Sequence, residues 1–398
     1  MSDSLNLYDT LFPVIRKAQP HEDARRLRVF VWVVVGLLVE KTISLPLIAL
    51  AIASTAKMAS RTRRLRRFLA NPHVCVRAYY DVLIRGALAD WAGQTMYLVL
   101  DTTTVRGRVV ILRVSLVYRG RAVPLVWQVY ERKSVSLPIK LYREVLGHVR
   151  GLLPPGVTVV LLGDRGFRTA TLMRWCRSPH IGWHFRLRLK ANQRITWGEG
   201  QTCLLRELGL QPGQKGFLHD VALGGRHYGP IHLAMAWSKP EPSEPEPSEK
   251  KKSEAWYIAS DEPTDDGTLG EYGLRMDIEE ELLDDKSGGF QLEATELADA
   301  ASISRLLLVM SVAYLHVVSV GTFVVAAGLR RSVDSHWARG LSYFQIGWRW
   351  LRQSVYHDQP FLRLFRLIPG PDPEPVPVSR ARRTQPVWSL WSLACTHT

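Results

Sequence analysis

EYGLRMDIEEELLDDK, residues 271–286, has the residue spacing of an amphipathic α-helix. At about 100° per residue, an arc of about 60° carries the side chains of Tyr272, Arg275, Glu279 and Lys286. A separate apolar stripe for packing on a core holds Leu274, Ile278 and Leu282. The other acids after Tyr272 point away from the polar arc: Asp277, Glu280, Glu281, Asp284 and Asp285. Glu279 is thus the one acid between two cations and an aromatic hydroxyl, and Gly288 and Gly289 are the expected helix stop. A solvated acidic helix with chance spacing is the alternative.

The composition is that of a basic globular protein. With 398 residues and a hydrophobic fraction of 46%, the chain is long enough for about two or three domains, and it is neither a fibre nor a disordered tail. The net charge of +15 and the pI near 9.8 favour a polyanionic partner, nucleic acid before a membrane surface. The four cysteines have no metal-ligand spacing, which indicates free thiols in a reducing cytosol. We expect no secretory signal at the N-terminus.

One apolar stretch, Leu306 to Leu329, carries no Asp, Glu, Lys or Arg and is long enough to span a bilayer. His316, several Ser and Thr residues and the lack of a second convincing span favour a soluble protein with no membrane partner. We therefore predict a buried helix, or a pair of helices, on the face of a sheet. A membrane protein that spans at this stretch is the alternative.

Residues 1–90 have a helical pattern and contain a dense basic run. Five arginines fall within seven positions: Arg61, Arg63, Arg64, Arg66 and Arg67. A solvated helix face is one interpretation of this run. Because the total charge already favours nucleic acid, we interpret it as a phosphate-contacting element of a small helical DNA-binding domain.

The middle of the chain has the pattern of a mixed α/β sheet. The apolar run MYLVLDTT from Met96 contains Asp101, and the buried strand VTVVLLG at 157–163 is followed by Asp164. Two further strands at 108–118 and 122–130 and a helix at 138–153 lie between these two runs. The first and fourth strands of this order can lie side by side, which would bring the two aspartates together.

Asp101, Asp164 and Glu279 form a candidate metal site. Carboxylates at adjacent strand ends repel one another unless a cation lies between them, and Mg²⁺ takes oxygen ligands. Two metal ions about 3.5–4 Å apart can activate a water or a 3′-hydroxyl and stabilise the leaving oxygen of a phosphodiester. The alternative for either aspartate alone is a turn residue or a helix cap.

LVLDTT, LLGDRGF and Tyr-x2-Arg-x3-Glu-x6-Lys together resemble the signature of the DDE transposases of bacterial insertion sequences, specifically the subgroup with a Tyr-Arg-Glu-Lys motif. The resemblance covers roughly residues 95–350. It implies an α/β (α+β) fold, an RNase H-like mixed sheet flanked by helices, with a β-rich insertion between the second Asp and the Glu. Residues 183–258 fall in that interval and are β-rich. The Pro/Glu/Ser/Lys loop at 239–254 has no counterpart in the family's pattern and is expected to be disordered.

The resemblance also implies a domain order. An N-terminal helical DNA-binding domain is followed by the first part of the catalytic core, the insertion, the second part of the core with the helix of the catalytic Glu, and a basic C-terminal helical region. Their expected boundaries are 1–90, 91–182, 183–260, 261–330 and 331–398.

Roles for individual residues follow from the same resemblance. Asp101, Asp164 and Glu279 would hold two Mg²⁺ ions, for which Mn²⁺ is expected to substitute. Tyr272, Arg275 and Lys286 would contact phosphates around the cleaved strand, and Arg165 would be a further phosphate ligand. Trp256 or Trp237 would stack on a flipped base, with a core role as the alternative. The arginine run at 61–67 would bind the terminal repeats.

We therefore expect a cut-and-paste DNA transposase, a metal-dependent endonuclease that cleaves at element ends and transfers the 3′-hydroxyl into target DNA. Its partners would be double-stranded DNA, in element ends and target, and a second copy of the chain, in a homodimer that holds two ends. The expected location is the bacterial cytoplasm, with the nucleoid. A catalytically silent, domesticated transposase that acts as a DNA-binding protein or an inhibitor of transposition is the alternative.

Overall fold

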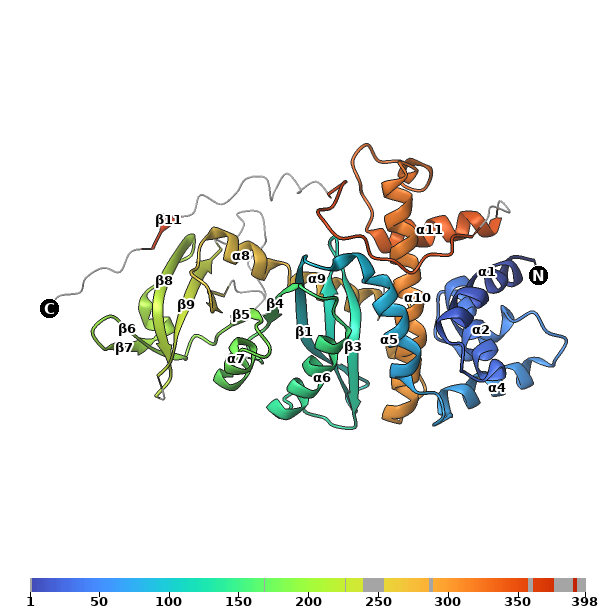
Figure 1. Ribbon diagram of the computed structural model, residues 1–398, viewed down its shortest axis with the longest axis horizontal. Helices are drawn as coiled ribbons and strands as arrows, with labels where there is room; N and C mark the ends of the chain where they lie inside the picture. Colours follow the sequence, from blue (N-terminus) through green and yellow to red (C-terminus); the bar gives the residue numbers. More distant parts are fainter. Residues whose placement is uncertain are drawn as a thin grey trace, which may run out of the picture. The chain divides into compact units, whose positions relative to one another are not determined.

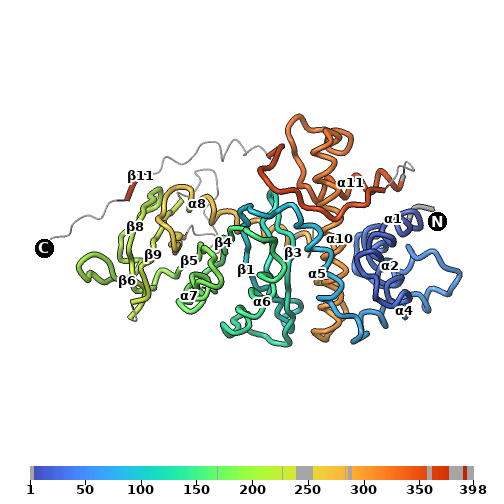
Figure 2. Tube along the Cα trace, viewed as in Figure 1, coloured from blue at the N-terminus to red at the C-terminus, as the bar shows by residue number. Residues whose placement is uncertain are grey.

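A computed structural model describes residues 2–167, 169–225, 227–238, 254–285, 289–356, 361–375 and 389–391. By its internal contacts the chain divides into two units (Figures 1 and 2). The first unit comprises Met1–Thr95, Asp101–Val157 and Asp277–Pro377, and the second comprises Met96–Leu100, Thr158–Met276 and Val378–Thr398. The predicted loop at 239–254 lies, except for Glu254, outside the described residues. Cys75, Cys176 and Cys203 are free thiols, as the sequence predicts.

The first unit begins with helices, as expected for residues 1–90. They are α1 (Ser2–Ala18), α2 (Ala24–Glu40), α3 (Leu45–Leu50), α4 (Met58–Ala70) and α5 (Val76–Ala87). Asp23 caps α2 because its side chain accepts the backbone N–H groups of Arg25 and Arg26 at 2.9 and 3.0 Å. Lys41 ends the same helix in the left-handed conformation, with a φ of 55°.

Three strands of the first unit follow the order β3-β2-β1. They are β1 (Thr95–Val105), β2 (Val109–Val117) and β3 (Ala122–Tyr130). β2 and β3 pair antiparallel, with an irregularity between Val114 and Ser115. The nearly continuous burial of β2 and β3 agrees with their long apolar runs, and α6 (Ile139–Leu152) packs on both strands.

A long helix, α10 (Ala300–Ala326), forms the core of the first unit. It contacts α2, α4, α5, β3 and α11 (Tyr343–Tyr356). By length and composition it is able to cross a membrane, with a mean hydropathy of 2.0, and 94% of its most apolar window is buried in the protein. Asp299 caps its first turn, accepting the N–H of Ser302 at 2.7 Å. The stretch predicted from Leu306 is thus a buried helix that packs on a strand, as expected.

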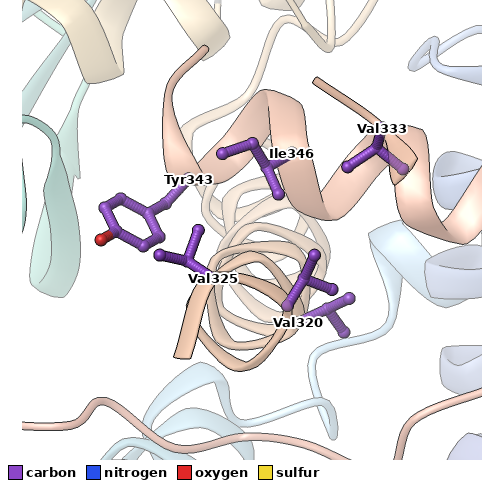
Figure 3. Packing of buried hydrophobic residues seen from close by; sticks show 6 residues of the cluster. Val320, Val325, Val333, Tyr343 and Ile346 are labelled. Carbon is purple, nitrogen blue, oxygen red and sulfur yellow. The ribbon is translucent and has the colours of Figure 1, made fainter. Parts of the chain in front are cut away.

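α10 and α11 approach each other closely at two glycines. A Cβ at Gly321 would lie 1.9 Å from the carbonyl oxygen of Tyr343, and one at Gly347 would lie 1.9 Å from that of Val317. Next to this crossing, apolar side chains from both helices and the segment between them interdigitate (Figure 3). The cluster comprises Val320, Val324, Val325, Val333, Tyr343 and Ile346. The small residues therefore set the distance between the two helices.

His316 makes the stability of the first unit depend on pH. The residue is fully buried in α10, its Nδ1 donates to the carbonyl of Leu364 at 2.9 Å, and its Nε2 has no partner among the described residues. Burial lowers its pKa to about 4. Because the folded pKa lies below the ordinary 6.5, the contribution to stability is complete above pH 6.5 and is lost as the pH falls towards 4.

We expect the free energy of unfolding to fall by at most about 1.4 kcal/mol per pH unit in that window because of His316. Urea titrations of wild type and His316→Gln at pH 7.5 and pH 5 check this. The loss between the two pH values should be smaller in the variant, and an equal loss in both proteins would contradict the assignment.

The second unit contains the residues Met96–Leu100 of β1 and seven further strands of its sheet path. Its strand order is β1-β4-β5-β10-β9-β8-β6-β7. The strands are β4 (Thr158–Gly163), β5 (His184–Arg188), β6 (Arg194–Trp197), β7 (Gln201–Leu204), β8 (Gln214–Leu223), β9 (Tyr228–Trp237) and β10 (Trp256–Ser260). β4 and β5 pair parallel, whereas β5/β10, β10/β9 and β9/β8 pair antiparallel. The predicted mixed α/β architecture and the adjacency of the first and fourth strands are confirmed.

The second unit also has two helices, α7 (Ala170–Arg177) and α8 (Asp266–Gly273). Its last strand, β11 (Ser389–Leu390), pairs parallel with β8. Thr169 caps α7 by accepting the N–H of Leu172 at 3.1 Å, and Asp265 caps α8 by accepting that of Thr268 at 3.0 Å. The region predicted to be a β-rich insertion is β-rich.

The continuous helix predicted for residues 271–286 is wrong. α8 ends at Gly273, Leu274 and Arg275 form a turn, and α9 (Met276–Leu283) starts a new helix. Tyr272 and Glu279 therefore belong to different helices, and the shared arc calculated from one helical axis does not apply. Three glycines in the short α8, Gly267, Gly270 and Gly273, favour the break because glycine weakens a helix.

Candidate active site and nucleic-acid-binding surfaces

The two units divide the three predicted metal ligands between them. Asp101 is half-buried in β1 and Glu279 is exposed on α9, both in the first unit. Asp164 directly follows β4 in the second unit. Its Oδ1 accepts the N–H of Gly166 at 2.7 Å, and its carbonyl accepts the N–H of Phe167 at 3.1 Å. The turn geometry that we considered as the alternative for Asp164 is thus present, and it leaves the second carboxylate oxygen of Asp164 outside this turn bond.

Three of the five acids that we expected to point away from the polar arc are buried. Glu281 of α9 is 0% exposed, and Asp284 and Asp285, which directly follow the helix, are 4% and 3% exposed. Their charges are met by Arg113 of β2 and by Arg121, which lies just before β3. The helical pattern identified Ile278 as a core residue correctly, but it could not reveal two arginines that are more than 150 residues away in the sequence.

Burial also changes the acidity of this helix. It raises the pKa of Asp277 to about 7, against the opposing charge of Arg121. In the same way it raises the pKa of Asp284 to about 6, although Arg121 also donates a hydrogen bond to it. The pKa of Glu281 is raised by burial as well, with Arg113 opposing the shift. These acids therefore hold protons more tightly than exposed carboxyl groups do.

In the second unit, Tyr272 lies beside predicted site residues. Its ring is 2% exposed and packs edge-on against Trp256, with centroids 5.4 Å apart. Burial raises the pKa of its hydroxyl, the charges of Arg275 and Arg188 lower it, and the charge of Asp164 raises it. Asp164, Tyr272 and Arg275 thus share one electrostatic environment. Lys286, the last residue of the motif, lies outside the described residues.

Glu271 holds the end of α8 in this position. Its carboxylate accepts hydrogen bonds from the hydroxyl of Tyr97 at 2.9 Å and from Nε of Arg186 at 2.7 Å. Tyr97 belongs to the part of β1 that lies in the second unit, and Arg186 belongs to β5. Two strands of the sheet therefore fix the residue that precedes Tyr272.

A basic pocket of about 560 Å³ lies in the second unit, and we call it the insertion pocket. The residues that carry its chemistry are Arg165, Arg188, Lys190, Arg206, Trp237 and Tyr257. The carboxylate of Glu254 bridges two of the cations, 2.9 Å from Arg165 and 3.0 Å from Arg188. Of the two tryptophans considered for base stacking, Trp237 lines this pocket, whereas Trp256 packs against the cluster of Ala234, Ile258 and Tyr272.

A second basic pocket, of about 520 Å³, lies in the first unit between α2 and α4, and we call it the arginine pocket. Its cationic lining comprises Arg25, Arg26, Arg28, Arg64 and Arg67. The apolar lining comprises Val29, Trp32, Ile52, Leu65 and Phe68. Like charges gather here without enough acids to neutralise them: among these arginines the structure records an ion pair for Arg26 alone, with Glu22 at 2.6 Å. Such a surface suits a polyanion.

The predicted arginine run serves several purposes. Arg64 and Arg67 line the arginine pocket, Arg66 lines a different cavity, and Arg63 is exposed. Arg61 has a structural role, because it donates to the carbonyl groups of Ala49 and Ile52 at 3.1 and 3.0 Å. The arginines of α2 were not among the predicted residues, although the segment ARRLR at 24–28 carries the same basic signal.

Among the described residues one group of three potential metal ligands meets within 4.8 Å: His184, Asp261 and Glu262. None of them is a predicted metal ligand. Arg186 already supplies a cation to this group, 3.7 Å from Asp261 and 2.7 Å from Glu262. Arg186 also pairs with Glu271 at 2.7 Å, so its single positive charge does not balance these acids, and the group of three stays a possible metal site.

No protein-family model matches the chain, and no curated protein matches it. Among solved structures, the fold is similar to that of a piggyBac transposase in a synaptic complex with hairpin DNA, determined by cryo-EM. The similarity covers 90% of this chain and 81% of that chain, with 12% sequence identity and a TM-score of 0.44. A likeness of this size leaves the function to be argued from the residues themselves.

Proposed function

We propose that the protein is a DNA transposase that cleaves at element ends and joins the freed 3′-hydroxyl to target DNA, with Asp101, Asp164 and Glu279 as its metal ligands. The observation that carries the proposal is the arginine pocket, because five arginines on two helices present a polyanion-binding surface. The chemistry is supported by the motif resemblance and by the neighbouring positions of β1 and β4 in the sheet. A bacterial source, a cytoplasmic location and a homodimer that holds two ends belong to the same proposal.

The donor atoms of the proposed ligands suit Mg²⁺ or Mn²⁺. All three side chains are carboxylates, and hard divalent cations prefer oxygen ligands. When bound, such ions supply Lewis-acid activation of the attacking oxygen and stabilisation of the leaving oxygen. We propose that Arg275 and Arg165 hold phosphate oxygens of the DNA strand beside Asp164. Trp237 would stack on a base of that strand.

The test uses purified protein and labelled DNA that carries the putative ends of the element. Reactions with Mg²⁺, Mn²⁺ or EDTA are compared for wild type and Asp164→Asn. Metal-dependent cleavage at the element boundary, lost in the variant, supports the proposal. Tight end binding without cleavage under any divalent metal would replace it with a catalytically silent DNA-binding protein. Absence of binding would reject both.

The arginine pocket predicts a change in the salt dependence of DNA binding. In the double variant Arg28→Gln/Arg64→Gln, the slope of log K against log salt concentration should become less negative by about 0.9 for each phosphate that the variant no longer neutralises. Fluorescence anisotropy between 50 and about 300 mM KCl measures the slope. Arg63→Gln is the matched control, since Arg63 is exposed on the same helix and does not line the pocket. Equal slopes in all three proteins would exclude the pocket as a phosphate-binding surface.

A further inference from the structure

Glu281 of α9 and the two residues that follow the helix, Asp284 and Asp285, are buried acids, which is rare because carboxylates usually lie on the surface. Glu281 is 0% exposed and Asp285 is 3% exposed. Burying a carboxylate is costly unless hydrogen bonds and an opposite charge compensate. Buried acids at these two positions therefore indicate a specific cationic partner within the protein.

That partner is Arg113, which is 2% exposed in the middle of β2. One guanidinium nitrogen, Nη1, donates to Glu281 and also to Asp285, the latter at 2.6 Å. A single cation thus joins Glu281 of α9 to Asp285, which lies two residues after the end of the helix at Leu283. Because both bonds converge on one atom, they restrict rotation of the helix about its axis as well as its distance from the strand.

A second arginine, Arg121, contacts Glu280 of α9 and Asp284, the first residue after the helix. Nε of Arg121 donates to Asp284 at 3.1 Å, and its Nη1 lies 3.4 Å from Glu280. The N–H of Phe290 donates to the carbonyl of Asp284 at 3.0 Å. A Cβ at Gly289 would lie 2.2 Å from that carbonyl oxygen, so Gly289 lies close to Asp284.

α9 has only eight residues, and a helix of that length is not stable on its own. Its orientation must come from its contacts with the rest of the first unit. Glu279 is exposed, whereas Glu281 is buried two residues further along the same helix. The position of Glu279 in the first unit therefore depends on how the other side of the helix is held.

We infer that Arg113 is a positioning residue, which fixes the orientation of α9 through Glu281 and Asp285 and thereby aims the carboxylate of Glu279. The effect of this orientation on cleavage rests on the function proposed above. The role of Arg113 in holding α9 does not rest on it, because that role depends only on contacts within the first unit. Arg113 would act on the reaction without touching DNA or metal.

Three variants separate positioning from simple loss of stability. Arg113→Met leaves two buried carboxylates without a cation. Arg113→Lys keeps one positively charged donor nitrogen. In the wild type both acids bond to a single nitrogen of Arg113. The neutral triple variant Arg113→Met/Glu281→Gln/Asp285→Asn removes every buried charge of the cluster and is the variant most suited to stay folded. Arg305→Met is the control, because Arg305 is another buried arginine of the first unit, bonded to the carbonyl groups of Leu69 and Val74.

Two readouts are needed: hydrogen exchange of the α9 amides, and kcat and KM for end cleavage in Mg²⁺. In the triple variant we expect exchange in α9 to be at least about tenfold faster, relative to other helices of the first unit, and kcat to fall with KM for DNA unchanged. Arg113→Lys should restore most of both. Arg305→Met should change the stability of the protein without making hydrogen exchange in α9 faster relative to the other helices of the first unit.

Wild-type exchange in α9 and wild-type kcat in the triple variant would overturn the inference. A change in exchange with no change in kcat would overturn the positioning role and leave Arg113 as a structural residue. If the wild type itself fails to cleave DNA, the proposed function fails, and the exchange measurement still decides whether Arg113 fixes α9.

Discussion

Replacing Glu279 with glutamine is expected to abolish metal-dependent cleavage while DNA affinity stays within about twofold of wild type. The change keeps the size of the side chain and removes the charge that a divalent cation requires. We expect cleavage to fall by at least about 100-fold, since loss of a residue that only supports a metal ligand already costs about ten- to a hundredfold. Single-turnover cleavage of a labelled element end, together with anisotropy for binding, measures the two quantities.

Glu280→Gln is the matched control for this experiment. Glu280 is the next residue of α9 and is also exposed, and its carboxylate lies 3.4 Å from Arg121. Because the Glu280 side chain is about half exposed, its pair with Arg121 contributes little, and the control should cleave at nearly the wild-type rate. If Glu279→Gln and Glu280→Gln cleave equally well, Glu279 is not a ligand and another acid must take its place.

Replacing Gly347 with valine is expected to lower the free energy of unfolding of the first unit by about 3 kcal/mol or more. The added Cβ would lie 1.9 Å from the carbonyl oxygen of Val317, and that oxygen is backbone, so it cannot move without shifting α10. The two helices would have to separate, which opens space next to the buried cluster around Val320 and Ile346. Urea denaturation followed by circular dichroism gives the change.

Gly147→Ala also replaces a glycine in a helix, but we expect this variant to lose no stability. Gly147 lies in α6, and a Cβ there would meet no atom within 4 Å. Alanine favours a helix over glycine by about 1 kcal/mol, so this variant should be as stable as wild type or more stable. A Gly347→Val protein as stable as Gly147→Ala would mean that α10 and α11 are not in close contact.

Sequence patterns were most informative where neighbouring residues alone determine the structure. The apolar runs at 96–101 and 157–163 predicted β1 and β4 and their adjacency, because a continuous apolar run indicates a strand that is buried on both faces. The stretch from Leu306 predicted a buried helix because it is long, apolar and carries no charged residue. Asp164 lies directly after β4, as expected from the pattern.

The helix at 271–286 shows where such patterns fail. A calculation at a fixed angle per residue assumes one straight axis, and it cannot detect the turn at Leu274 and Arg275 that starts a second axis. It also cannot show which of the acids outside the polar arc are buried. Glu281 and Asp285 are buried because Arg113 meets them from β2, a partner that only the tertiary structure brings close. The arginines of α2 were missed because their neighbours on α4 lie about 40 residues further along the chain.

The place of α10 in the chain has a consequence for synthesis on the ribosome. α2, α4 and α5 pack against this helix, yet it begins at Ala300, more than 200 residues after the end of α5 at Ala87. At about 5–20 residues per second, that interval lasts about 10–40 s. During this time the apolar faces of the early helices have no final partner, so the nascent chain should depend on chaperones and aggregate when it is truncated before residue 300.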